Sequence, residues 1–140
     1  MWQDVIISRL LSKEEIKKGL CTIFPVKANE ILVVDNIESI QGYLGEDIRI
    51  LCQTWLSKVE FPFSISIYLR DQSLIPNENK LQHDIDKIGE FCETLICEAI
   101  IGDESVNPYS WLLIRSRVDY RQTFINLDLY DCREPYETKK

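Results

Sequence analysis

Residues 63–70 alternate between apolar and polar side chains. The apolar set is Phe63, Ile65, Ile67 and Leu69, and the polar set is Ser64, Ser66, Tyr68 and Arg70. Side chains of an extended chain point alternately to its two faces, so this pattern predicts a strand with one buried and one solvent-exposed face. Such a strand needs neighbouring strands and a covering layer, which the rest of the chain must supply.

The segment from Ser12 to Pro25 has the pattern of an amphipathic helix. Ser12 and Glu15 form the sequence signature of a capping box at its start. Apolar residues recur at positions 16, 20, 23 and 24, which lie on one face of a helix. Pro25 disfavours helical backbone at the residue before it, so we expect the helix to end there.

A second apolar stripe predicts a second helix. Its members recur at i, i+4, i+7 and i+11 and are Leu81, Ile85, Ile88 and Cys92. Asn77 or Asn79 is expected to cap the start, and the helix is expected to give way near Glu93. Residues 95–101 then have the pattern of a strand, with a longer helix as the alternative.

Five further segments are expected to be strands, namely residues 3–8, 30–35, 48–56, 109–117 and 122–130. The apolar run in 30–35 favours an interior strand buried on both faces. The resulting order, β-α-β-β-β-α-β-β-β, predicts a two-layer α+β sandwich with two helices and a mixed or mostly antiparallel sheet of about six to seven strands. We expect one domain over residues 1–131 and a flexible C-terminal tail over 132–140.

The net charge and the length of the apolar runs argue against several classes of partner. The chain of 140 residues carries a net charge of −7, which argues against nucleic acid and against an anionic membrane surface. Its longest apolar runs are four residues, far short of the about 20 that a membrane span needs. The N-terminus has no secretory signal pattern, and the five cysteines are odd in number and widely spaced, so we expect reduced thiols in the cytoplasm.

No catalytic or cofactor motif stands out. His83 is the only histidine, and its position on the second helix predicts exposure to solvent. One histidine and scattered cysteines do not supply a zinc site, and no glycine-rich phosphate loop occurs, so no metal or cofactor is expected. Cys92 and Cys97 would lie about 140° apart on a continuous helix. A redox pair would require a strand to begin between them, and core thiols are the default expectation.

Most of the negative charge falls in one region. Residues 78–104 contain eight acidic residues against two lysines, a net charge of −6. Asp86 and Glu90 are like charges at i, i+4, which costs a helix about 0.2–0.5 kcal/mol. A solvated face that keeps the protein soluble would explain the pattern. The functional alternative is that Asp86, Glu90 and Glu93 dock a basic protein partner.

Three arginines surround the last predicted turn. Arg115 and Arg117 would share one face of a strand, and Arg121 follows the turn. Such a group can clamp a carboxylate or a phosphate. The favoured interpretation is that these charges guard an exposed sheet edge against aggregation.

These patterns favour a non-enzymatic protein-interaction module. The expected type is a small acidic binder of a basic partner, similar in character to inhibitor, immunity or chaperone proteins. A homodimer is compatible with this hypothesis. The alternative is a small enzyme or ligand-binding protein that uses an anion site near Arg115, Arg117 and Arg121.

Overall fold

A computed structural model describes residues 2–37, 45–57, 60–75, 80–107, 109–125 and 134–135. The helices are α1 (Lys13–Ile23) and α2 (Lys80–Leu95), with short 3-10 helices η1 (Ala28–Glu30) and η3 (Gln72–Leu74). The strands are β1 (Gln3–Ile7), β2 (Ile31–Val34), β3 (Ile50–Leu56), β4 (Phe63–Leu69), β5 (Ala99–Gly102), β6 (Ser110–Ile114), β7 (Tyr120–Phe124) and β8 (Glu134–Pro135). The predicted order of two helices and seven strands is confirmed, and β8 is an addition to it.

The strands of the described residues form one open, mixed sheet. Its order is β2-β3-β4-β1-β5-β6-β7, with β8 pairing to β3. β2 and β3 run parallel, and the other pairs are antiparallel. β1 and β2 therefore point the same way with β4 and β3 between them, so the connection through α1 crosses two strands. β4, the strand with alternating apolar and polar residues, lies inside the sheet between β3 and β1.

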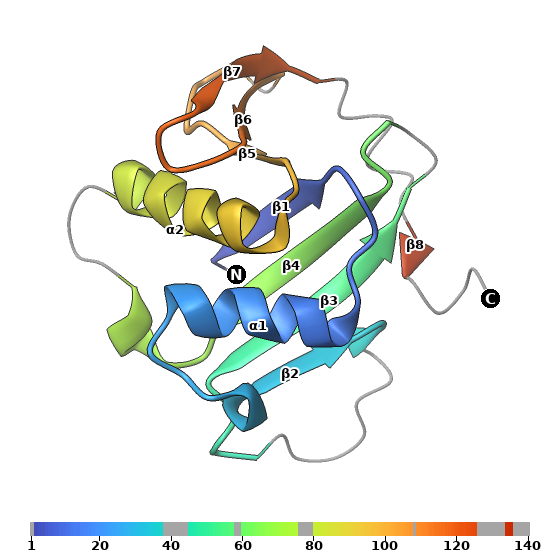
Figure 1. Cartoon of the computed structure of the whole chain (residues 1–140), viewed down its shortest axis with the longest axis vertical. Helices are drawn as coiled ribbons and strands as arrows, with labels where there is room; N and C mark the ends of the chain where they lie inside the picture. The colour runs from blue at the N-terminus through green and yellow to red at the C-terminus, as the bar shows by residue number, and fades with distance from the viewer. Residues whose placement is uncertain are drawn as a thin grey trace.

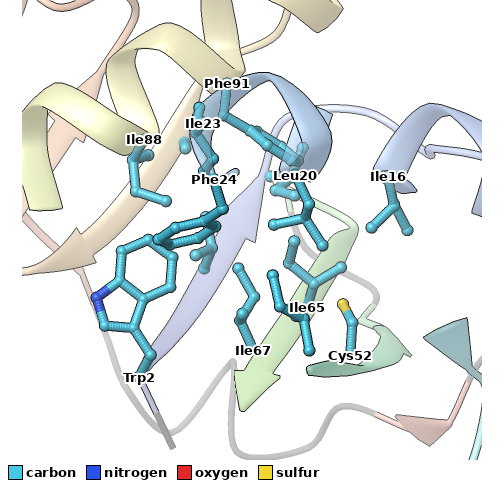
Figure 2. Close-up of a cluster of buried hydrophobic side chains, with 14 of the residues drawn as sticks. Trp2, Ile16, Leu20, Ile23, Phe24, Cys52, Ile65, Ile67, Ile88 and Phe91 are labelled. Atoms are coloured by element: carbon cyan, nitrogen blue, oxygen red, sulfur yellow. The ribbon is translucent and has the colours of Figure 1, made fainter. Parts of the chain in front are cut away.

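Both helices lie side by side on one face of the sheet, which makes the fold a two-layer α+β sandwich (Figure 1). The core fills the space between the layers. Figure 2 shows Ile65 and Ile67 of β4 facing Leu20 of α1, with Ile88 and Phe91 of α2 in the same cluster. Each of these five side chains is buried. Burial of this apolar surface is the main favourable term in folding.

The start of α1 forms as the sequence predicts. Glu15 N donates to Ser12 Oγ and Ser12 N donates to Glu15 Oε1, each at 3.1 Å, so the capping box is complete. The two helices lie close together at Gly19, where an added Cβ would lie 2.6 Å from the ring of Phe91. A larger residue would force the buried Phe91 ring to shift, which gives a reason for a helix-weakening glycine at this position.

The polar face of residues 63–70 is exposed only toward its C-terminal end, where Tyr68 is half-buried and Arg70 is exposed, so the expectation is wrong for the two serines. Ser64 and Ser66 are 5% and 2% exposed. Trp55 of β3 donates from Nε1 to Ser66 Oγ at 2.9 Å, and Ser66 Oγ donates to Asp4 Oδ1 at 3.3 Å. A neighbouring tryptophan therefore shares this face, and its indole N–H satisfies the polar group that it helps to bury.

Several element boundaries also differ from expectation. β2 stands at the end of the described strand order and not inside the sheet, and it is fully buried on one face only, because Leu32 and Val34 are half-buried. α2 continues through Leu95, and β5 begins at Ala99. β6 ends at Ile114, because Arg115 N donates to Asp119 O and closes the hairpin turn there. Neither described helix is long and apolar enough to cross a membrane.

Some expectations fall on residues that the structure does not describe. They include the helix caps Asn77 and Asn79 and the strand residues 126–130. Within the predicted tail, Glu134 and Pro135 pair with Leu56 and Trp55 of β3. The domain boundary at 131 stays a prediction.

Replacing Ile67 with alanine should lower the free energy of unfolding by about 2–5 kcal/mol, because a fully buried side chain leaves a cavity between the layers. The measurement is equilibrium unfolding in urea. Val106→Ala is the control, since Val106 is exposed and should change stability by no more than about 0.5 kcal/mol. Equal losses in the two variants would contradict the placement of β4 in the core.

Candidate functional site

The predicted acidic residues lie along one side of α2. Asp86 is exposed and accepts a hydrogen bond from Gln82 Nε2 at 3.0 Å. Glu90 is half-buried one turn further on, and Glu93 is exposed. The helix therefore brings the three carboxylates onto one stripe. They are not equivalent, because Glu93 is engaged by another element of the fold.

Glu93 binds the turn of the β6–β7 hairpin through Arg117. Its Oε2 accepts from the Arg117 backbone N at 2.8 Å and from Nε at 3.1 Å, and its Oε1 accepts from Nη2 at 3.0 Å. The hydrogen bonds from the Arg117 side chain hold the pKa of Glu93 below its ordinary value. Glu93 therefore holds the hairpin turn in place by hydrogen bonds and is also part of the acidic stripe.

The three arginines do not form one cluster. Arg115 and Arg117 lie in the turn after β6, so they do not share a strand face as predicted. Arg115 Nε donates to Glu98, and Arg117 is paired with Glu93. Arg121 stands on β7 opposite Leu113, and strand alternation places it on the sheet face away from α2. Two arginines are therefore neutralised by carboxylates and the third lies elsewhere.

A glycine allows the hairpin turn to lie directly against α2. An added Cβ at Gly89 would lie 2.5 Å from the backbone N of Arg117 and 2.7 Å from the carbonyl carbon of Ser116. Backbone atoms cannot rotate away, so this contact needs glycine. Asp86 and Glu90 both raise the pKa of Arg117, after the larger effect of its bond to Glu93. The acidic stripe and the turn therefore form one continuous surface.

Exposed apolar side chains lie on the turn and on β7 of the same hairpin. Val118, directly after Arg117, is 92% exposed. On β7, Tyr120 is 41% and Phe124 is 65% exposed. We call the surface formed by Asp86, Glu90, Val118, Tyr120 and Phe124 the α2–hairpin surface. The charge of the stripe was visible in the sequence, but these apolar neighbours were not.

A buried acid was missed by the sequence analysis. Asp84, counted there with the surface charge, is 0% exposed. Its Oδ1 accepts from Trp2 Nε1 at 2.9 Å and its Oδ2 from Gln3 Nε2 at 2.7 Å. The Nδ1 atom of His83 lies 3.1 Å from Oδ1, and the His83 ring packs edge-on against Trp2.

This contact changes the interpretation of the only histidine. The His83 side chain is 21% exposed, so the prediction of a water-facing residue is wrong. Both Asp84 oxygens are occupied by donors from the N-terminal segment and no solvent reaches them. The arrangement anchors the N-terminal segment to α2.

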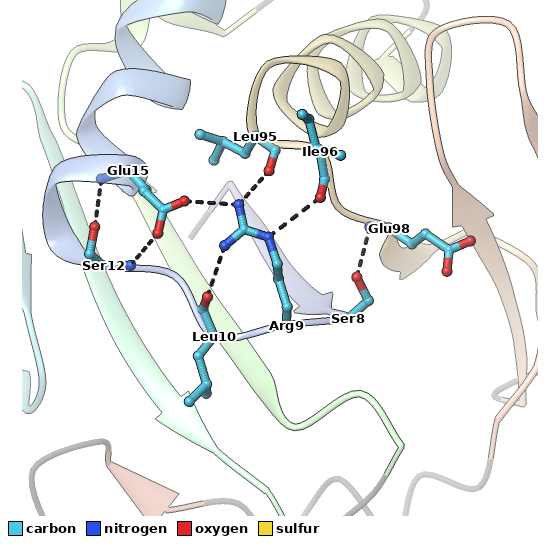
Figure 3. Close-up of polar contacts among 8 residues, drawn as sticks. All are labelled: Ser8, Arg9, Leu10, Ser12, Glu15, Leu95, Ile96 and Glu98. Atoms are coloured by element: carbon cyan, nitrogen blue, oxygen red, sulfur yellow. Dashed lines mark hydrogen bonds and ion pairs between the residues drawn. The ribbon is translucent and has the colours of Figure 1, made fainter.

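A surface cavity of about 470 Å³ opens at the end of α2. Its lining combines Cys92, Glu93, Ile96, Cys97, Glu98, Arg115 and Ser8. Arg9 holds the adjoining turn, because its guanidinium donates to the carbonyls of Leu95 and Ile96 and pairs with Glu15 at 2.8 Å (Figure 3). The cavity therefore has a fixed wall at the junction of β1, α1 and α2.

No protein-family model, curated protein or solved structure matches this chain.

Replacing Asp84 with asparagine should lower the free energy of unfolding by about 1–3 kcal/mol, because one carboxylate oxygen becomes an NH₂ group that faces a buried N–H donor. Urea unfolding measures the loss. Asp86→Asn, two residues along on the exposed face, makes the same chemical change and should alter stability by no more than about 0.5 kcal/mol. An unchanged free energy of unfolding in the Asp84→Asn variant would show that these hydrogen bonds do not stabilise the fold.

Proposed function

We propose that the chain is a non-enzymatic protein-interaction module that binds a basic protein partner through the α2–hairpin surface. The observation that carries the proposal is the close contact at Gly89, which joins the carboxylates of Asp86 and Glu90 to the exposed Val118 in one surface. Stable interfaces combine an apolar centre with a polar rim. This surface offers both components on neighbouring elements.

Charge complementarity defines the partner. The chain has a net charge of −7, and most of it comes from α2 and the residues around it. A basic partner would be attracted over several ångströms before contact, which raises its association rate. The exposed Val118, Tyr120 and Phe124 would then be covered in the complex, which favours slow dissociation.

The anion-site alternative is less well supported. An anion that approached Arg115 or Arg117 would have to displace Glu98 or Glu93 from its guanidinium. The cytoplasmic placement is part of our proposal, and it is supported by four free cysteines among the described residues.

The test compares two double variants of equal charge. Asp86→Asn with Glu90→Gln removes two charges from the α2–hairpin surface. Glu14→Gln with Glu60→Gln removes two charges from exposed positions elsewhere. Proteins from the source cells that bind the native chain are identified by quantitative mass spectrometry beside both variants. A partner of the proposed kind is basic, is retained by the second variant and is reduced with the first.

The association rate with that partner should fall about tenfold in the first variant at low salt, and the difference should shrink at high salt because screening weakens the charges that were removed. Both variants should unfold in urea within about 0.5 kcal/mol of the native chain. Equal association rates and equal salt slopes for the two variants would overturn the proposal.

A further inference from the structure

The end of α2 brings two cysteines together that a straight helix would separate. Cys97 N donates to Cys92 O at 3.2 Å, and Ile96, which follows the last residue of α2 and precedes Cys97, has a left-handed φ of 53°. This combination is a Schellman motif, in which the chain folds back over the last helical turn. In this motif the residue that follows the left-handed residue typically packs its side chain against the side chain five positions earlier in the helix. Cys97 and Cys92 occupy those two positions.

The turn forms although isoleucine is an unfavourable residue for its left-handed position. Glycine normally occupies the left-handed position, and a β-branched side chain is a clear outlier there. Ile96 is 84% exposed, so its side chain gains little from burial. The hydrogen bonds from Arg9 to the carbonyls of Leu95 and Ile96 hold the backbone in place. The juxtaposition of the cysteines is therefore built into the junction of β1, α1 and α2.

The two thiols have different environments. Cys92 is 1% exposed, and its Sγ lies 3.6 Å from the carbonyl oxygen of Ile114. Cys97 is half-buried, and both residues line the cavity of about 470 Å³. A hydrogen bond from Cys92 lowers the pKa of Cys97, and nearby Arg9 acts in the same direction. The same hydrogen bond raises the pKa of Cys92.

We propose that Cys92 and Cys97 form a reversible dithiol–disulfide site that exchanges with low-molecular-weight disulfides in the cavity at the end of α2. The accessible Cys97 attacks, and the buried Cys92 resolves. This site is separate from the α2–hairpin surface and does not depend on the proposed docking.

The exchange balances as a two-electron reaction. The Cys97 thiolate attacks one sulfur of a disulfide RSSR, forms a mixed disulfide and expels RS⁻. The Cys92 thiol loses its proton and attacks the Cys97 sulfur, which forms the Cys92–Cys97 bond and expels the second RS⁻. The two thiol protons of the protein end on the two RSH products. The protein dithiol is oxidised, RSSR is reduced to 2 RSH, and excess RSH reverses both steps.

Other cysteines of the chain provide internal controls. Cys52 is 0% exposed and burial raises its pKa, so it should be inert. Cys21 on α1 is half-buried like Cys97, but burial raises its pKa and the structure gives it no neighbouring thiol among the described residues. Exposure alone would make Cys21 and Cys97 equally reactive. The proposal requires them to differ.

The experiment uses the full reduced chain and glutathione disulfide as the probe. The folded protein is equilibrated with graded ratios of glutathione disulfide to glutathione, alkylated, digested and analysed by mass spectrometry. We expect a Cys92–Cys97 disulfide that forms with rising ratio and disappears when glutathione is restored. In the absence of glutathione disulfide, iodoacetamide should modify Cys97 several-fold faster than Cys21, because the thiolate is the reacting form and the pKa is lowered at Cys97 but raised at Cys21.

Two variants distinguish attacking from resolving thiol. Cys92→Ser should accumulate a persistent glutathione adduct on Cys97, whereas Cys97→Ser should leave Cys92 unmodified. If either variant fails to fold, disulfide formation and alkylation in the native chain still test the proposal. Absence of the Cys92–Cys97 disulfide at every ratio, preferential pairing of Cys97 with another cysteine, or equal alkylation of Cys21 and Cys97 would each overturn it.

Discussion

The close crossing of the two helices is the constraint on which the rest of this structure depends. Both helices must cover the same face of one sheet, and Gly19 lets α1 approach until its backbone meets the ring of Phe91. At this separation Arg9 reaches both Glu15 at the start of α1 and the last carbonyls of α2. The turn that follows α2, the cavity beside it and the start of β5 are all positioned from that junction.

The local elements were predictable because they follow from short-range patterns. The capping box of Ser12 and Glu15 and the alternation of β4 each lie within a few residues. The order of strands was not predictable, because β1 pairs with residues more than fifty positions away. The face of Ser64 and Ser66 was misjudged for the same reason, since polarity indicates exposure only when no distant side chain such as Trp55 covers it.

For the candidate sites, the sequence predicted which residues are charged but not their burial or their partners. Asp84 and Asp86 look alike in the sequence, yet one is buried under Trp2 and the other is exposed. Glu93 was expected to be free for docking, but Arg117, distant in sequence, occupies it. The meeting of Cys92 and Cys97 depends on the single left-handed residue Ile96, and no propensity rule predicts an isoleucine there.

The placement of β1 has a consequence for the time course of folding. β1 lies in the interior of the sheet, where its partners are β4 and β5, residues 63–69 and 99–102. A ribosome adds about 5–20 residues each second, so β1 would wait several seconds before both of its neighbours exist. Until β4 emerges, the apolar Val5, Ile6 and Ile7 of β1 have no strand to pair with, and until β5 emerges one edge of β1 stays open. Completion of the fold is therefore a late, long-range closure event, and the nascent chain is most open to aggregation before β5 emerges.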